Sequence, residues 1–173
     1  DKGALYIIDG MKRTIPMGLI AAAGQQPEEL NPKADFEDLP RSGWDPKFRI
    51  ADQNKDGVSA EVIYPSVGMV LCNHPDADYK TASFEAYNRW ITEYCSEDPQ
   101  RLLGIGQTAL ETVESSIDDI TRMKEQGLRG VMMSGNPHTD FDFDDPQWDP
   151  FWQAAVDLDM PLSWHILTTK ESG

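Results

Sequence analysis

The stretch that decides the fold reads ADQNKDGVSAEVIYPS, residues 51–66. Its first half contains D-x-N-x-D-G at 52–57, the pattern that opens a calcium-binding EF-hand loop. Such a loop needs a bidentate carboxylate at its position 12, and Ile63 occupies that position here. The second half, 58–63, alternates and is rich in β-branched residues, which is typical of a strand. We therefore interpret the stretch as a helix that ends near Asn54, a tight Asp-Gly turn and a buried strand.

The same helix-then-strand pattern repeats along the rest of the chain. Asp45 and Pro46 supply an N-cap and a first-turn proline for the helix before this strand, and Asp149 and Pro150 repeat that start later. Gly127 is expected to end another helix as its left-handed C′ residue. The predicted elements are helix 45–54, strand 58–64, helix 77–96, strand 102–107, helix 113–126, strand 130–133, helix 149–158 and strand 161–166.

This alternation predicts an α/β fold with parallel strands, because each crossover helix then covers a face of the sheet. Two closures stay open: an open doubly wound sheet, or a portion of a (β/α)8 TIM barrel. A complete barrel takes at least ~200 residues. With 173 residues and four clear strands, the chain would make up roughly half of such a barrel.

The N-terminal part of the sequence differs from the regular part. The stretch ALYIIDGMKRTIPMG (4–18) places two short apolar runs around an Asp-Gly pair, which predicts a β-hairpin. Residues 21–45 are rich in Ala, Gly, Pro and acidic residues and are expected to be irregular. We expect a single domain, 1–173, in which 1–43 form a hairpin and irregular insertion and 44–173 form successive βα units.

The composition limits the classes of partner. The chain has 15 basic and 30 acidic residues and a net charge of −15, which argues against nucleic acid or an anionic membrane as a partner. No apolar run reaches the ~20 residues that a membrane-spanning helix needs. Cys72 and Cys95 give no disulfide framework and suit a reducing compartment, so a cytoplasmic location is expected. Cys95 falls on the apolar face of a predicted helix, whereas the role of Cys72 stays open.

Candidate site residues follow the predicted strands, because both closures place their working face at the C-terminal strand ends. His165 is near the end of the last strand, and His74 and His138 lie in loops after earlier strands. A histidine at a strand end can ligate a metal if a second group orients its other ring nitrogen. The alternative for each of the three is a hydrogen-bonded structural histidine, and His74 and His138 are expected to be exposed loop residues.

Other polar residues at the strand ends are weaker candidates. Tyr64, Ser66 and Asn136 could line a substrate pocket, or could simply serve turn chemistry. The loop TDFDFDDPQWDP (139–150) carries five aspartates that could bind a hard cation, although a solvated surface loop explains them as well and Asp149 is assigned as a helix cap. No glycine-rich phosphate loop, G-x-S-x-G elbow or C-x-x-C motif is present.

Four segments carry a family resemblance: GWDPKFRIADQNKDGVSAEVIYPSVG (43–68), AYNRWITEYCSEDPQRLLGIGQTAL (86–110), GLRGVMMSGNP (127–137) and WDPFWQAAVDLDMPLSWHI (148–166). Together they resemble the amidohydrolase-2 family, the branch of the amidohydrolase superfamily that includes aminocarboxymuconate-semialdehyde decarboxylase and γ-resorcylate decarboxylase. The resemblance runs in order through most of 44–167, and YIIDGMKRTIPMGLIAAAG (6–24) is similar to a hairpin insertion in bacterial members.

The resemblance implies a (β/α)8 barrel with a divalent metal, often zinc, at the strand ends. The family's ligands are a His-x-His pair on the first strand, a histidine in the middle of the barrel and an aspartate on the last strand. A further histidine activates the metal-bound water. His165 matches the middle ligand, whereas the other ligands and the catalytic histidine have no counterpart in this sequence. The segment therefore resembles the interior of such an enzyme.

Our first hypothesis is a metal-dependent hydrolase or carboxy-lyase that uses a metal-activated water on a small, often aromatic or cyclic, organic acid. We expect its partners to be this substrate and a second copy of the chain in a dimer. The alternative hypothesis is a non-catalytic acidic α/β interaction module in which His165 is structural. A calcium-dependent binding domain is the third, and Ile63 argues against it.

Overall fold

The computed structural model describes residues 3–12, 14–20, 22, 24–166 and 168–169. The chain divides into two compact units, Asp1–Ser59 and Ala60–Gly173. A single domain over 1–173 remains a prediction. No helix in the described ranges is long and apolar enough to cross a bilayer.

The first unit contains one antiparallel strand pair and mostly short helical turns. Strands β1 (Leu5–Tyr6) and β2 (Ile15–Pro16) pair antiparallel, as the hairpin prediction requires. The segment expected to be irregular, 21–45, contains three 3₁₀ turns. The helical elements of this unit are α1 (Met17–Ile20), η1 (Pro27–Glu29), η2 (Phe36–Asp38), η3 (Arg41–Gly43) and α2 (Pro46–Asp56).

Helix α2 shows what the D-x-N-x-D-G motif becomes. The Asp45 side chain accepts a hydrogen bond from the Lys47 N–H at 3.2 Å, which confirms the predicted N-cap. The helix continues to Asp56, past the predicted end near Asn54, and Gly57 follows in the left-handed conformation with φ 71°. The motif therefore lies in the last turns of a helix, where its carboxylates cannot wrap around an ion as an EF-hand loop does.

The second unit is built on parallel strands in chain order. Strand β3 (Glu61–Ile63) pairs with β4 (Leu102–Gly104), β5 (Gly106–Gln107) pairs with β6 (Val131–Met133), and β6 pairs with β7 (Leu162–Trp164). Every one of these pairs is parallel, as predicted.

Strands β4 and β5 are the two halves of the single predicted strand 102–107. They are separated only by Ile105, whose N–H donates to Ile63 O at 3.0 Å, whereas the next N–H, of Gly106, donates to Gly130 O at 3.0 Å. The segment 102–107 therefore pairs first with β3 and then with β6. The resulting order, β3, β4/β5, β6, β7, is the order that successive βα units produce.

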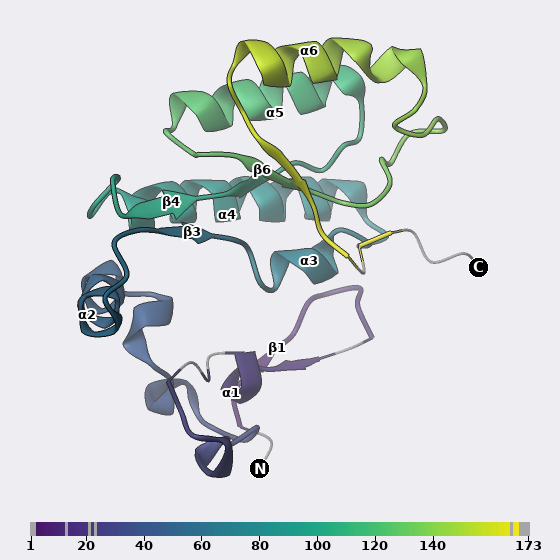
Figure 1. Cartoon of the computed structure of the whole chain (residues 1–173). Coiled ribbons are helices and arrows are strands. Elements are labelled where there is room, and N and C mark those ends of the chain that lie inside the picture. Colours follow the sequence, from purple (N-terminus) through teal and green to yellow (C-terminus); the bar gives the residue numbers. More distant parts are fainter. Residues whose placement is uncertain (1–2, 13, 21, 23, 167, 170–173) are drawn as a thin grey trace. The chain divides into compact units, whose positions relative to one another are not determined.

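Helices fill the crossovers between the strands. Between β3 and β4 lie α3 (Gly68–Leu71) and α4 (Ala77–Cys95), between β5 and β6 lies α5 (Val113–Glu125), and before β7 come η4 (Pro146–Trp148) and α6 (Asp149–Asp157). Helices α5 and α6 lie side by side, and α4 runs beside β4 (Figure 1).

Of two helix ends predicted from the sequence, one is confirmed and the other is wrong. Gly127 has φ 85°, and the Leu128 N–H donates to Met123 O at 3.0 Å, which confirms the predicted C-terminal motif. The prediction that Asp149 caps the last helix is wrong. Asp145 provides the cap, because it accepts from the Gln147 N–H at 2.9 Å and starts η4, so that Asp149 is already inside the helix.

The two faces of the sheet have different neighbours. Cβ atoms built on Gly104 and Gly106 would meet side chains of α4, of α5 and of the α5–β6 connection, so these positions face the helices. The residues between them alternate to the other face. There, Ile105 and Met132 join a buried cluster with Cys72, Phe84 and Ala109.

Candidate active site at the strand ends

The loops that follow the C-terminal ends of the strands are joined to one another. The His138 ring donates from Nε2 to Cys72 O at 2.9 Å, and its backbone N–H donates to Leu110 O at 3.0 Å. The Asn73 amide donates to Thr169 O at 3.1 Å. The segments after β3, β5, β6 and β7 therefore meet at one rim, which is where parallel βα folds carry their sites.

His165 lies on this rim, directly after β7. Its backbone N–H donates to Met133 O at 3.3 Å and so extends the β6–β7 ladder by one residue. The ring Nδ1 lies 2.6 Å from Ile166 O. A carbonyl oxygen can only accept, so Nδ1 carries the proton and Nε2 carries the lone pair. Within the described ranges Nε2 has no hydrogen-bond partner, so the ring has the tautomer that a metal ligand needs.

Tyr64 is the predicted pocket residue with the most informative contact. Its Oη lies 3.0 Å from Ser163 Oγ, on the last strand. In a flat sheet, three spacings of about 4.8 Å each would separate β3 from β7 by about 14 Å. Tyrosine and serine side chains joined end to end are shorter than that. The sheet is therefore curved, with Tyr64 and Ser163 on its concave face.

Ser66 and Asn136 make local contacts. Ser66 is exposed, and its carbonyl accepts from the Met69 N–H at 3.4 Å at the start of α3. The Asn136 amide donates to Asp142 at 3.1 Å within its own loop. Neither contact connects these residues to His165, whereas Tyr64 is connected to the strand that carries it.

His74 is not the exposed loop residue that was expected. It is only 3% exposed, its Nδ1 accepts from the Asp76 N–H at 3.1 Å, and its ring stacks on Tyr79 with centroids 4.4 Å apart. His138 is half-buried and holds two loops together. Both rings are engaged in the structure of the rim, in agreement with the structural alternative for them.

The acidic loop is organised by its aromatic residues. Phe141 and Phe143 pack around the fully buried Trp148, with ring centroids 6.0 and 5.3 Å away. The aspartates alternate with these rings, so most of them point outward, and Asp142 and Asp145 accept the hydrogen bonds described above. Nowhere among the described residues do three His, Cys, Asp or Glu side chains come together as a metal site would require.

A buried ion pair beside the rim was not predicted from the sequence. Lys80 on α4 is 1% exposed and lies 2.5 Å from Glu111, in the loop after β5. In that loop Leu110 adopts a left-handed conformation with φ 56°, which is strained for leucine. Burial raises the pKa of the nearby Cys72 thiol to about 11, although Lys80 opposes the shift. Lys80 lies four residues before Phe84, on the apolar face of α4, and this spacing could have predicted that Lys80 is buried.

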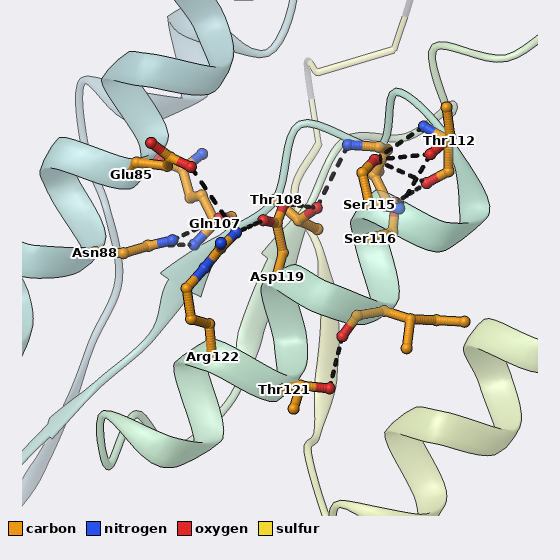
Figure 2. A network of polar contacts seen from close by, with 12 residues as sticks. Glu85, Asn88, Gln107, Thr108, Thr112, Ser115, Ser116, Asp119, Thr121 and Arg122 are labelled. Carbon is orange, nitrogen blue, oxygen red and sulfur yellow. Dashed lines mark hydrogen bonds and ion pairs between the residues drawn. The ribbon is translucent and has the colours of Figure 1, made fainter.

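A polar network behind the sheet holds β5 in place (Figure 2). The Asn88 side chain accepts from the Gln107 N–H at 2.9 Å and donates to Gln107 O at 2.8 Å. Asn88 thus supplies both hydrogen bonds that a neighbouring strand would give.

The network continues onto α5. Thr108 donates to Asp119 at 2.8 Å, and Arg122 pairs with Asp119 at 2.6 Å. Burial raises the pKa of the Asp119 carboxyl, against the hydrogen bonds from Thr108 and Arg122, which lower it. Beside it, Glu85, Asn88, Arg122 and others line a polar cavity of about 240 Å³ between α4 and α5. These contacts connect α4, β5 and α5 on the face away from His165.

A family model described as "Amidohydrolase" matches residues 16–171. The chain belongs to the amidohydrolase-2 family. This confirms the resemblance drawn from the sequence. A curated relative, 2-amino-3-carboxymuconate-6-semialdehyde decarboxylase of Dictyostelium discoideum, is 28% identical over 132 residues, which cover 75% of this chain and 36% of the relative.

Solved structures give the same picture of the fold. Manganese-bound 5-carboxyvanillate decarboxylase of Novosphingobium aromaticivorans is 27% identical with a TM-score of 0.57, covering 68% of this chain and 33% of that one. For 2,6-dihydroxybenzoate decarboxylase of Rhizobium the TM-score is 0.61 at 19% identity, covering 87% and 46%. The latter likeness concerns the fold alone. The chain thus spans between a third and a half of the length of these relatives.

The described residues fit a divalent metal only in part. His165 lies after a strand end, and its Nδ1 contact with Ile166 O leaves the Nε2 lone pair open. A divalent metal in a protein needs at least three ligand groups, and the described residues bring no three together.

Proposed function

We propose that this chain forms part of a metal-dependent enzyme that removes carbon dioxide, without oxidation, from a small organic acid, often an aromatic or cyclic one. Two relatives above 25% identity support the reaction, since both are decarboxylases by name. One acts on 5-carboxyvanillate, an aromatic acid, and the other on 2-amino-3-carboxymuconate-6-semialdehyde, an open-chain unsaturated acid. Metal-dependent hydrolysis is the second candidate, because a metal-bound water can also attack an amide, ester or lactone. The non-catalytic module is less favoured, because the named relatives are enzymes.

The fold we propose is a portion of a (β/α)8 barrel, with the first unit contributing a hairpin insertion. The parallel strands in chain order support it. So does the Tyr64–Ser163 contact across the concave face, because that contact requires the curvature of a barrel wall.

The observation that carries the function is the state of His165. Its Nδ1–H is held by Ile166 O, and its Nε2 lone pair is available at the strand end. We propose His165 as one metal ligand, with the other ligands coming from outside the described residues. The bound metal would lower the pKa of a water molecule and polarise the substrate carboxylate. Zinc is the metal expected from the family, whereas manganese occupies one relative.

The chain's own residues would orient the substrate beside that ligand. Tyr64 has the best position, because its hydroxyl reaches the strand of His165. Ser66 and Asn136 belong to the same rim and are proposed as peripheral pocket residues. The hydrogen bonds from His138 to Cys72 O and from Asn73 to Thr169 O would hold the rim loops in place while the substrate binds.

The test is the substitution His165→Ala in the full-length protein. We expect the affinity for Zn²⁺ or Mn²⁺ to fall at least about a hundredfold, because loss of a direct ligand should exceed the 10–100-fold cost of losing its supporting group. Release of carbon dioxide from benzoate-type acids should fall in parallel. Ile166→Ala is the matched control, since Ile166 directly follows His165 and is 78% exposed.

Three results would change the proposal. Unchanged metal content and turnover in the His165→Ala protein would remove His165 from the site. Hydrolysis of an amide or lactone without carbon dioxide release would favour the second candidate. A protein that binds no metal and turns over nothing would favour the non-catalytic module. The predicted dimer and cytoplasmic location remain proposals, and size-exclusion chromatography with light scattering tests the former.

A further inference from the structure

Ser163, which contacts Tyr64, was not predicted as a site residue from the sequence. It lies two positions before His165, so their side chains leave the strand on the same face, about 6.6 Å apart along it. Tyr64 is 46% exposed, and its hydroxyl is on the concave side. The hydroxyl pair therefore occupies the layer next to the proposed metal ligand.

The hydrogen-bonding capacity of this pair is not used up. Each hydroxyl can donate one hydrogen and accept through its oxygen. One of them donates to the other at 3.0 Å, and the second keeps its hydrogen. Within the described ranges neither hydroxyl has another hydrogen-bond partner. Whichever way the first bond points, one O–H donor is left for a third group.

A role in stability alone explains the Tyr64–Ser163 pair less well than a role in binding. A hydrogen bond between two partly exposed hydroxyls adds only about 0.5–1.5 kcal/mol to stability. The neighbouring concave residue on β3, Val62, is apolar and 51% exposed, so an apolar pair would suit this face equally well for packing. A pair with a spare donor beside a metal ligand suits recognition of an oxygen atom.

We propose that Tyr64 and Ser163 together determine substrate specificity by donating one hydrogen bond to an oxygen substituent on the substrate ring. The inference rests on the proposed function, since it places the substrate carboxylate toward the metal beside His165. The ring oxygen would be a hydroxyl, a phenolate or an ether oxygen, all of which accept. Tyr64 positions the Ser163 hydroxyl or donates itself, and the two act as one unit.

The experiment uses the full-length, metal-loaded protein and the variants Tyr64→Phe, Ser163→Ala and the double variant. Binding of a hydroxybenzoate and of the benzoate without that hydroxyl is measured by competition, together with kcat and KM for the acid that is turned over. We expect each single variant to weaken hydroxybenzoate binding about tenfold, the upper end of the worth of one hydrogen bond. Benzoate binding should change less than about threefold, because benzoate lacks the ring oxygen that accepts the hydrogen bond. The double variant should be no weaker than the singles, because the pair acts as a unit.

The controls remove hydroxyls elsewhere. Tyr6→Phe alters an exposed tyrosine of the first unit, and Thr121→Val removes a hydroxyl that bonds Ile117 O within α5. Both should leave the ratio of the two affinities unchanged. Circular dichroism and melting temperature confirm that every variant folds.

Distinct results would separate the two proposals. If the variants weaken both acids equally, or neither, the specificity role is wrong while the decarboxylase can stand. If the unaltered protein neither binds nor decarboxylates either acid, both the proposed function and this inference are overturned. Additive losses in the double variant would show two independent contacts and contradict the single unit.

Discussion

The two faces of the parallel sheet in the second unit follow different rules. On the helix side, side chains such as Ile91, Ile120 and Phe151 are completely buried. On the concave side, Val62 is 51% and Tyr64 46% exposed, and a hydroxyl pair crosses from the first strand to the last.

This difference separates what stabilises the fold from what could act on a ligand. The completely buried apolar side chains on the helix side stabilise the fold, because the folding energy grows with the apolar area removed from water. The concave side also buries Ile105 and Met132, but at the ends of β3 and β7 it presents polar atoms that a ligand can reach. Substitutions on the two faces should therefore affect different measurements.

The largest expected effect is on the helix side. Phe151→Ala empties the space of a side chain that is 0% exposed and packs on Trp148 at 5.5 Å, so the free energy of unfolding should fall by about 3–5 kcal/mol. Val156→Ala, on the same helix but 72% exposed, should change it by less than about 0.5 kcal/mol. Urea unfolding measures both. Equal losses from the two variants would show that α6 does not pack as a buried layer.

Asn88 tests whether a buried polar contact on the same side matters as much as packing. Asn88→Ala leaves the N–H and C=O of the buried Gln107 without partners, which should cost about 2–4 kcal/mol. The Gln107 amide should also exchange its hydrogen faster. Glu93→Ala, an exposed change on the same helix, is the control. A loss below about 0.5 kcal/mol would mean that water replaces the amide without penalty.

The sequence predicted the helix side better than the concave side, for physical reasons. Helix ends such as Gly127 are set by local backbone chemistry, so a short pattern identifies them. Asp149 was misassigned because Asp145 precedes a proline in the same way, and both pairs satisfy the local rule. The predicted strands came out too long. The largest excess, residues 58–60, precedes β3 and is exposed, and propensity does not distinguish such a segment from a strand.

The candidate site shows the same division. His165 could be placed at a strand end from periodicity alone, and the structure puts it there. Ser163 could not be selected, because its contact joins residues 99 positions apart and a serine in a strand carries no pattern. His74 was expected to be exposed, since its stacking on Tyr79 depends on how the start of α4 turns. Contacts of this kind follow from the tertiary fold.

The smallest effect we predict concerns Asp119, a carboxyl on the helix side whose pKa burial raises above its ordinary value of 3.8. A raised pKa means that the folded state binds this proton more tightly than the unfolded state does. The contribution to stability is then fully present below 3.8 and is lost as the pH rises through the folded pKa. Asp119→Asn removes this titration, so the stability of the unaltered protein relative to the variant should decline as the pH rises from 3.8.

Urea midpoints of both proteins between pH 4 and 7 measure this trend, and Asp118→Asn, an exposed neighbour, corrects for the loss of one negative charge. Two opposing forces act on the carboxylate: burial disfavours its charge, whereas Thr108 and Arg122 hydrogen-bond to it at 2.8 and 2.6 Å. A relative stability that rises with pH would show that these bonds outweigh burial. In that case the network between α4, β5 and α5 would be an ion pair that stabilises the helix side, and the contrast between the two faces would rest less on apolar packing.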